Sequence, residues 1–196
     1  QPFSDDEVER ATVVGRQTAQ WVLAALCAVP QIAAGYAGAP DVTCGTQGEV
    51  VVPVPPISDA PAHLEVLADQ KLLVGTSSGG GSIIARLTSN GSVDASFANA
   101  GSLLLAGSTL NEFLVQSDGR IVVAAKSASG PYVARFLFDG TPDVTFGVAG
   151  VASAPGGVQG FSAMAIQADG KIVVTGPQSI NAGQLMLARF AGNGVL

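Results

Sequence analysis

The chain has 196 residues, of which 47% are hydrophobic and only 12% are charged, about half the usual charged share. This composition predicts one domain with a buried core, or a small domain with an appendage, and argues against a disordered chain. The net charge of −6 and the lack of any basic run argue against a nucleic-acid partner, because binding to phosphates depends on clustered Lys and Arg.

Residues 1–39 differ in composition from the rest of the chain. Two arginines precede a stretch without charge, in which the apolar run 21–29 is followed by small residues with an Ala-x-Ala pattern at 37–39. This order is typical of a secretory signal, although the acidic start and Pro40 are unusual for one. A packed helix and a membrane anchor, which needs about 20 apolar residues, are the alternatives. We expect an exported protein, periplasmic, at the cell surface or secreted, with a membrane partner only if this segment is an anchor.

Residues 40–196 are self-similar, with a period near 50 residues. Three markers recur in the same order, which is the signature of a repeat architecture. The markers are PDVTCG, VDASFA and PDVTFG (40–45, 93–98, 142–147); VLADQKLLVG, VQSDGRIVVAA and IQADGKIVVTG (66–75, 115–125, 166–176); and IIARLTSNG, YVARFLFDG and LMLARFAGNG (83–91, 132–140, 185–194). We predict a β-repeat domain over 40–196, with units at about 40–92, 93–141 and 142–196.

Each unit is predicted to form about four antiparallel strands. Apolar runs are separated by Asp-Gly or Asn-Gly pairs, which are the strongest short hairpin signal. A two-residue turn at Asp118-Gly119 would place Val115 opposite Val122. In the second unit the strands are expected near 101–107, 110–116, 120–126 and 131–137.

Such a sheet has two apolar faces, as expected for a sheet packed between neighbours. One four-stranded sheet cannot bury both faces alone, so copies must stack. The predicted fold is therefore all-β, with about three propeller-like blades after an N-terminal helical or signal segment. Three blades are fewer than the roughly four to eight of a closed propeller, so we expect further blades or subunits to cover the open sheet faces.

Four stretches together resemble the delta-60 repeat: NGSVDASF (90–97), DGTPDVTFGVAG (139–150), AIQADGKIVVTG (165–176) and LMLARF (185–190). That repeat occurs in multiple copies in large, mostly bacterial and often exported proteins, and is regarded as propeller-like β structure. The resemblance covers about residues 40–196 and implies no established activity and no catalytic residues.

The first unit departs from this pattern in three places. Gln70 replaces the turn glycine, and Cys44 stands where Phe97 and Phe146 stand. We expect Cys44 to be a small apolar substitute for a core phenylalanine. TSSGGGS at 76–82 is expected to be an enlarged, flexible loop.

The cations of the repeat domain occupy recurring positions. Six of the seven follow a hairpin turn or lie in the AR strand, which favours a scaffold role over a single catalytic site; the strand series is Arg86, Arg135 and Arg189. Their stems are expected to cover the core while each head binds a carboxylate or a carbonyl. Asp94 and Asp143, eight residues after Arg86 and Arg135, are candidate partners. A strict two-residue turn, however, would place each pair on opposite faces of the sheet.

The residues that could carry other chemistry are few. Asp41, Asp94 and Asp143 could bind calcium, but one carboxylate per unit makes a poor calcium site, and local backbone hydrogen bonds are the expected role. His63 is the only histidine, and a position on the surface or rim is expected for it. We therefore predict no metal site, no cofactor and no catalytic residue.

The leading hypothesis is a non-enzymatic exported or surface scaffold, or a binding module. The loops at 76–82 and 153–160 would contact a protein or carbohydrate partner. The alternative is an enzyme, a hydrolase or lyase with its site at the mouth of the propeller channel. It would need His63 and Glu65, which lie two residues apart and could share a strand face. The other acids that break the repeat symmetry are Glu49, Asp59 and Glu112.

Overall fold

The computed structural model describes residues 40–51, 63–78, 80–178 and 183–196. The segment 1–39, with its expected export signal, helix or anchor, lies outside the described residues, as does Asp59. All regular elements of the described part are strands, and no helix suited to a membrane crossing occurs there. The strands are β1 (His63–Val66), β2 (Leu72–Ser78), β3 (Gly81–Leu87), β4 (Ser102–Ala106), β5 (Ser108–Val115), β6 (Ile121–Ser127), β7 (Gly130–Phe136), β8 (Val151–Ser153), β9 (Ala163–Ile166), β10 (Ile172–Pro177) and β11 (Leu185–Phe190).

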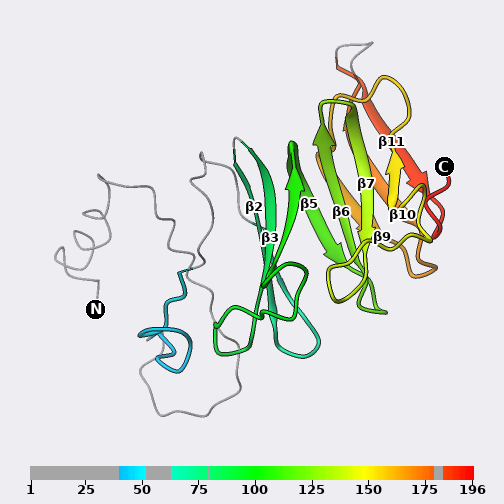
Figure 1. Ribbon diagram of the computed structural model, residues 1–196. Helices are drawn as coiled ribbons and strands as arrows, with labels where there is room; N and C mark the ends of the chain where they lie inside the picture. The colour runs from blue at the N-terminus through cyan, green and yellow to red at the C-terminus, as the bar shows by residue number, and fades with distance from the viewer. Residues whose placement is uncertain (1–39, 52–62, 79, 179–182) are drawn as a thin grey trace, which may run out of the picture.

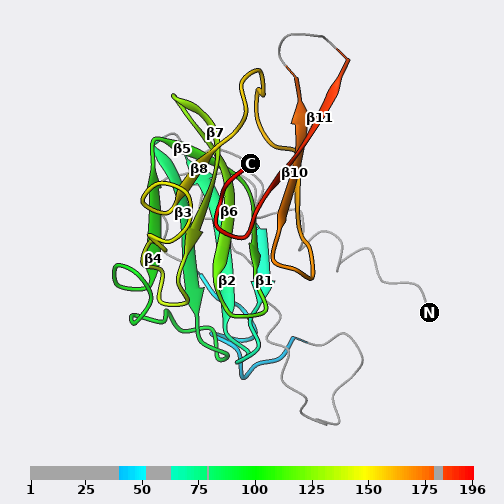
Figure 2. The ribbon, with the colours of Figure 1, turned by 90° about the vertical axis from the view of Figure 1, so that its right-hand side faces the viewer.

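Three antiparallel sheets follow one another along the chain, as the repeat predicts. Their strand orders are β1-β2-β3-β4, β5-β6-β7-β8 and β9-β10-β11. In Figure 1 the sheets lie next to one another, from β2 and β3 through β5–β7 to β9–β11, and Figure 2 shows the same stack turned by 90°. The prediction of an all-β fold built from repeated four-stranded units is confirmed. The strand expected at 101–107 is the outer strand β4 of the first sheet rather than the first strand of the second sheet.

The expected register of the second hairpin is wrong by one residue. Val115 lies opposite Ile121, and Leu114 lies opposite Val122. The cause is the turn: the Gly119 amide donates to the Gln116 carbonyl at 2.9 Å, and the Gln116 amide donates to the Arg120 carbonyl at 2.8 Å. The loop therefore has three residues, with Gly119 at a φ of 84°, which is a common hairpin geometry for an Asp-Gly pair. A slip of one residue exchanges the faces of every side chain in the strand.

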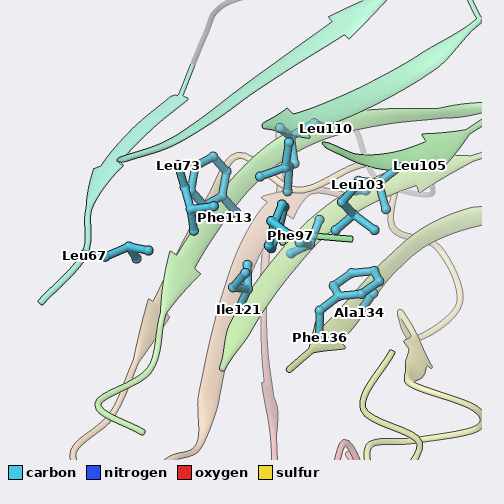
Figure 3. Packing of buried hydrophobic residues seen from close by; sticks show 13 residues of the cluster. Leu67, Leu73, Phe97, Leu103, Leu105, Leu110, Phe113, Ile121, Ala134 and Phe136 are labelled. Carbon is cyan, nitrogen blue, oxygen red and sulfur yellow. The ribbon is translucent and has the colours of Figure 1, made fainter. Parts of the chain in front are cut away.

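The gap between the first and second sheets is filled by apolar side chains. Phe97, Leu103, Leu110, Phe113 and Ile121 belong to this cluster, and Figure 3 shows them with side chains of both sheets. Burying a side chain of this size stabilises a fold by roughly 1.5–3 kcal/mol. This cluster therefore supplies much of the attraction that holds the two sheets together.

The central sheet is buried on both faces, as expected for a sheet between two neighbours. Val123 and Ala125 of β6 join the first cluster, whereas Val122 and Ala124 of the same strand pack with the third sheet. All four side chains are fully buried. Alternate residues of β6 thus contact the sheets on its two sides.

The segment 40–51 packs against part of the outer face of the first sheet, on the side away from the second sheet (Figure 1). Cys44 and Val50 pack there with side chains of β2 and β3. Cys44 is 1% exposed, so the prediction that it lies buried, where the other units have phenylalanine, is confirmed.

The expected enlarged loop at 76–82 is mostly strand. Thr76 and Ser77 belong to β2, and Ser82 belongs to β3. The Ser77 and Ser82 hydroxyl oxygens lie 2.8 Å apart, and each accepts a hydrogen bond from the Leu110 amide, at 3.0 and 2.7 Å. Because their polar groups are satisfied in this way, these serines can be buried between β2, β3 and β5.

Candidate functional site

Each complete unit contains an arginine–aspartate cluster between a third strand and the connection that follows it. Arg86 Nε donates to Asp94 Oδ2 at 2.8 Å, and Arg135 Nε donates to Asp143 Oδ2 at the same distance. The predicted pairing of an arginine with the aspartate eight residues later is therefore confirmed. It forms because the chain passes through a turn at Thr88–Ser92 before the Asp94 amide donates to the Arg86 carbonyl.

The same arginines join successive units. Arg86 Nη1 donates to the Phe138 carbonyl, and Arg135 Nη1 donates to the Gly192 carbonyl, each at 2.5 Å. Phe138 and Gly192 lie at equivalent positions in the turn after the third strand of the next unit. Both arginines are buried, at 2% and 7% exposure. Each cluster is therefore a polar link across an otherwise apolar gap.

Two further groups complete each cluster. The Arg86 guanidinium lies 4.7 Å from the Phe97 ring centroid, and the Arg135 guanidinium lies 4.7 Å from that of Phe146, which is the range of a cation–π contact. A second cation approaches each acid, Lys71 Nζ at 3.1 Å from Asp94 Oδ2 and Arg120 Nε at 3.1 Å from Asp143 Oδ2.

These contacts keep both aspartates ionised. Hydrogen bonds from Ser96 are the largest cause of the lowered pKa of Asp94, and Lys71 and Arg86 lower it further against the effect of burial. For Asp143, burial acts to raise the pKa, but hydrogen bonds from Thr145 and the charge of Arg135 outweigh it and lower the pKa. An acid with a depressed pKa is a poor proton donor near neutral pH.

The aspartates considered as calcium ligands are engaged by their own neighbours. The Asp41 carboxylate accepts hydrogen bonds from the amide and hydroxyl of Thr43, at 2.9 and 2.7 Å. Asp94 and Asp143 accept the same pair of bonds from Ser96 and Thr145. No group of three or more His, Cys, Asp or Glu side chains suited to a metal ion is found in the described ranges.

His63 and Glu65 share one face of β1, as their spacing predicts. Both are half-buried, whereas their neighbours Leu64 and Val66 are exposed. The His63 ring meets the edge of Phe113 at a centroid distance of 6.1 Å. The face they share is therefore turned toward β5 of the second sheet.

Two of the other symmetry-breaking acids lie on separate elements. Glu49 is exposed before the first sheet. Glu112 of β5 accepts a hydrogen bond from the Met164 amide of the third sheet. This bond between sheets has no sequence signal, because the corresponding strands carry His63 and Ala163 at that position.

A hollow of about 350 Å³ between the first and second sheets was not predicted from the sequence. It is lined by Leu105, Ser108, Ser127, Ser129, Gly130, Pro131, Tyr132, Ala134, Phe136, Val151 and Ser153. The lining combines serine hydroxyls with one tyrosine and contains no charged side chain. Its residues come from β4 to β8 and their connections, so a single stretch of sequence does not reveal it.

The loop 153–160 contacts both the second and the third sheet. The Ala154 amide donates to the Pro131 carbonyl, and the Gln159 amide donates to the Pro177 carbonyl. Val158 pairs with Gln178 in an isolated bridge. This loop therefore lies beside the ends of β7 and β10, and Ser153 brings its start to the hollow.

The chain matches one protein family, described as "Domain of unknown function (DUF5122) beta-propeller". The matched residues are 67–97, 116–146 and 167–196. These are β-propeller repeats. The first two matches each contain one whole arginine–aspartate cluster, and the third contains Arg189. No curated protein and no solved structure matches the chain. The finer resemblance to the delta-60 repeat stays a prediction.

Proposed function

We propose that this β-propeller repeat domain is a non-enzymatic, exported or surface scaffold that binds a partner in the hollow between its first two sheets. The uncharged lining of that hollow is the observation that carries the proposal. Its volume is in the range of small-ligand sites, which combine apolar walls with a few polar groups. Serine and tyrosine hydroxyls can donate and accept hydrogen bonds, so a neutral oligosaccharide is the ligand class that fits best.

The distribution of charge supports the same function. The arginines and aspartates that recur in the repeat bind one another and the turns of the next unit. Because these groups are satisfied within the scaffold, ligand contacts fall to the hydroxyl and aromatic groups around Ser129 and Tyr132.

Isothermal titration with neutral oligosaccharides, maltohexaose and cellohexaose, tests the proposal. We expect Ser129→Arg to abolish binding of the oligosaccharide that the chain binds, because the long side chain would fill the hollow. Ser162→Arg is the matched control, because Ser162 is exposed and lies outside the lining. Absence of binding for both sugars, or equal binding by both variants, would contradict this function.

Export has its own test. N-terminal sequencing of protein recovered outside the producing cells should find a new terminus near residue 39. An intact N-terminus on exported protein would exclude cleavage there.

A hydrolase or lyase activity is the alternative function, and the shared face of His63 and Glu65 is the observation that favours it. It predicts that His63→Ala and Glu65→Ala each abolish hydrolysis of a chromogenic glycoside. Activity that both variants retain would remove this alternative.

A further inference from the structure

The turn that follows the third strand of a unit carries different side chains at the two joints between units. At the first joint, between the first and second units, this turn contains Phe138; at the second joint, between the second and third units, the equivalent residue is Gly192. Each residue accepts a hydrogen bond at 2.5 Å through its carbonyl, Phe138 from Arg86 and Gly192 from Arg135. The backbone contact is therefore the same at both joints, and only the side chain differs.

At the first joint the Phe138 ring packs against the Arg86 guanidinium. The guanidinium lies 4.7 Å from the ring centroid of Phe97 and 4.7 Å from that of Phe138, and both distances are in the range of a cation–π contact. A second cation, Lys71 Nζ, lies 5.8 Å from the Phe138 centroid. The Phe138 ring thus contacts two cations of the preceding unit.

At the second joint the Arg135 guanidinium has one such ring among the described residues. It lies 4.7 Å from the Phe146 centroid, and Gly192 supplies no second ring. The Arg135 side chain is 8% exposed, compared with 3% for Arg86. All three of its nitrogens already donate hydrogen bonds within the joint. The flat face of the guanidinium is therefore the part that is open to a ligand.

A groove adjoins this turn at each joint. At the first joint the groove has a volume of about 330 Å³, and Phe138 is part of its lining. At the second joint the corresponding groove has a volume of about 400 Å³ and is lined by residues 115–118 and 166–170. A Cβ on Gly192 would have the Gly170 carbonyl oxygen as its nearest neighbour, at 3.7 Å. A ring beside Gly192 would therefore lie at this groove, as Phe138 lies at its own.

The contacts that hold a ring at the first joint have counterparts at the second joint. Lys71, which approaches the Phe138 ring, corresponds to Arg120. Gly119, where a Cβ would lie 3.4 Å from the Phe138 ring, corresponds to Gly170. These counterparts are all described, and they belong to the second unit and to the first turn of the third unit.

One polar atom in the lining of the second groove has no partner. The side-chain oxygen Oε1 of Gln116 is buried and accepts no hydrogen bond from the described residues. The equivalent residue of the first unit is Leu67, which is buried in the apolar cluster. Because a buried carbonyl oxygen without a donor is unfavourable, Gln116 favours a ligand that brings an N–H or O–H group into the groove.

We propose that the groove of the second joint binds an indole ring, that of an exposed tryptophan in a partner peptide. The ring stacks on the Arg135 guanidinium and lies near Arg120, as the Phe138 ring lies against Arg86 and Lys71. The chain itself thus shows, at its first joint, the kind of group that fills this space.

The lining selects an indole among the possible ligands. Of the aromatic side chains, tryptophan gives the strongest cation–π contact, and its N–H is a donor for Gln116 Oε1. Asp118 and Asp169 lie in the same lining, and their carboxylates disfavour an anion. A neutral ring with one donor therefore fits the groove better than a carboxylate or a phosphate.

This groove is separate from the hollow assigned to the oligosaccharide. The hollow lies at the turn between β6 and β7, whereas the groove lies at the turn between β5 and β6, at the opposite end of β6. The proposal does not depend on oligosaccharide binding, so the two binding experiments can fail independently.

An NMR titration of the ¹⁵N-labelled full chain with N-acetyl-tryptophanamide tests the site. The signals of Arg135 Nε–H and of the Gly170 and Gly192 amides should shift and saturate. N-acetyl-leucinamide should bind at least about tenfold more weakly, because it lacks the cation–π contact and the donor. Equal binding of the two amides, or no saturable shift with the tryptophan amide, would overturn the proposal.

Gly192→Phe is the decisive variant, because its own ring should fill the site as Phe138 does, and binding should be lost. Gly156→Phe is the matched control: Gly156 is exposed, and a Cβ there would meet no atom within 4 Å. It should bind as the unmodified chain does, and the remaining amide signals of both variants should match those of the unmodified chain. Binding that survives Gly192→Phe, or that both variants lose, would contradict the site.

Two exchanges between the joints complete the test. Phe138→Gly should open the first groove and add a second set of saturable shifts around Gly119; their absence would overturn the equivalence of the joints. Gln116→Leu, which introduces the residue of the first unit, should keep ring binding but remove the preference for N-acetyl-tryptophanamide over N-acetyl-phenylalaninamide. A preference unchanged in this variant would overturn the assignment of an indole.

Discussion

Replacing Arg135 by methionine should destabilise the fold more than any other change to a charged side chain of the second unit. Methionine keeps most of the apolar stem but removes the bonds to Asp143, Thr145 and the Gly192 carbonyl. The side chains of Arg135 and Asp143 are 8% and 4% exposed, so water can replace these bonds only in part. The lost bonds belong to the link between the second and third units.

The expected loss of stability depends on the contacts that Asp143 keeps when Arg135 is replaced. Removing one partner of a fully buried ion pair costs about 3–5 kcal/mol. Here Arg120 Nε remains 3.1 Å from Asp143 Oδ2, and Thr145 still donates to the acid, so we expect about 2–3 kcal/mol for Arg135→Met, near the cost of losing one or two charge-assisted hydrogen bonds. The double-mutant cycle with Asp143→Asn should give a coupling energy of about 1–2 kcal/mol.

Urea unfolding followed by fluorescence or circular dichroism measures these differences as shifts in the midpoint at constant slope. Lys126→Met is the control, because Lys126 is exposed and makes no ion pair in the described part of the chain; it should change stability by less than about 0.5 kcal/mol. A coupling energy below about 0.5 kcal/mol, or an Arg135→Met variant as stable as the control, would refute the role assigned to the cluster.

Three further changes test other features of the fold by the same unfolding assay. Gln70→Gly should raise the free energy of unfolding by up to about 1 kcal/mol. Gln70 has a φ of 66°, which strains a residue with a side chain, and the equivalent turns have glycine. A lower free energy of unfolding in the variant would contradict this. Because folding lowers the pKa of Asp94, protons bind more tightly to the unfolded state. Stability should therefore begin to fall near pH 5 and fall more steeply below about pH 4, and Asp94→Asn should reduce that slope. Gly176→Ala should cost at least about 1–3 kcal/mol, because its Cβ would lie 1.9 Å from the Gly160 carbonyl oxygen. Gly192→Ala is the control and should cost less, because its Cβ would lie 3.7 Å from the Gly170 carbonyl oxygen, an ordinary contact distance.

The repeat made the architecture predictable. Markers that recur every 50 residues indicate units that must stack, and the spacing of eight between Arg86 and Asp94 recurs between Arg135 and Asp143. A pair that keeps its spacing through two divergent copies suggests a contact. A two-residue turn would have separated the members of each pair, but the chain returns to the arginine through a longer connection.

The hairpin register and the loop at 76–82 could not be predicted for a different reason. An Asp-Gly pair occurs in both two-residue and three-residue turns, so the sequence around Asp118 does not distinguish registers that differ by one. The polar side chains of TSSGGGS suggest exposure to solvent. Ser77 and Ser82 are instead buried and accept hydrogen bonds from the Leu110 amide in β5, a strand of another sheet. Hydrogen bonds between residues so far apart in the chain leave no local pattern in the sequence.

The few charges of the chain include six that lie at the joints between units, namely Lys71, Arg86, Asp94, Arg120, Arg135 and Asp143. Apolar contacts such as those of Phe97 and Ile121 hold two sheets together but tolerate small slips, because the hydrophobic effect has no direction. A guanidinium that must reach the Asp94 carboxylate and the Phe138 carbonyl together fits one arrangement of two units. The clusters therefore set the relative position of the sheets.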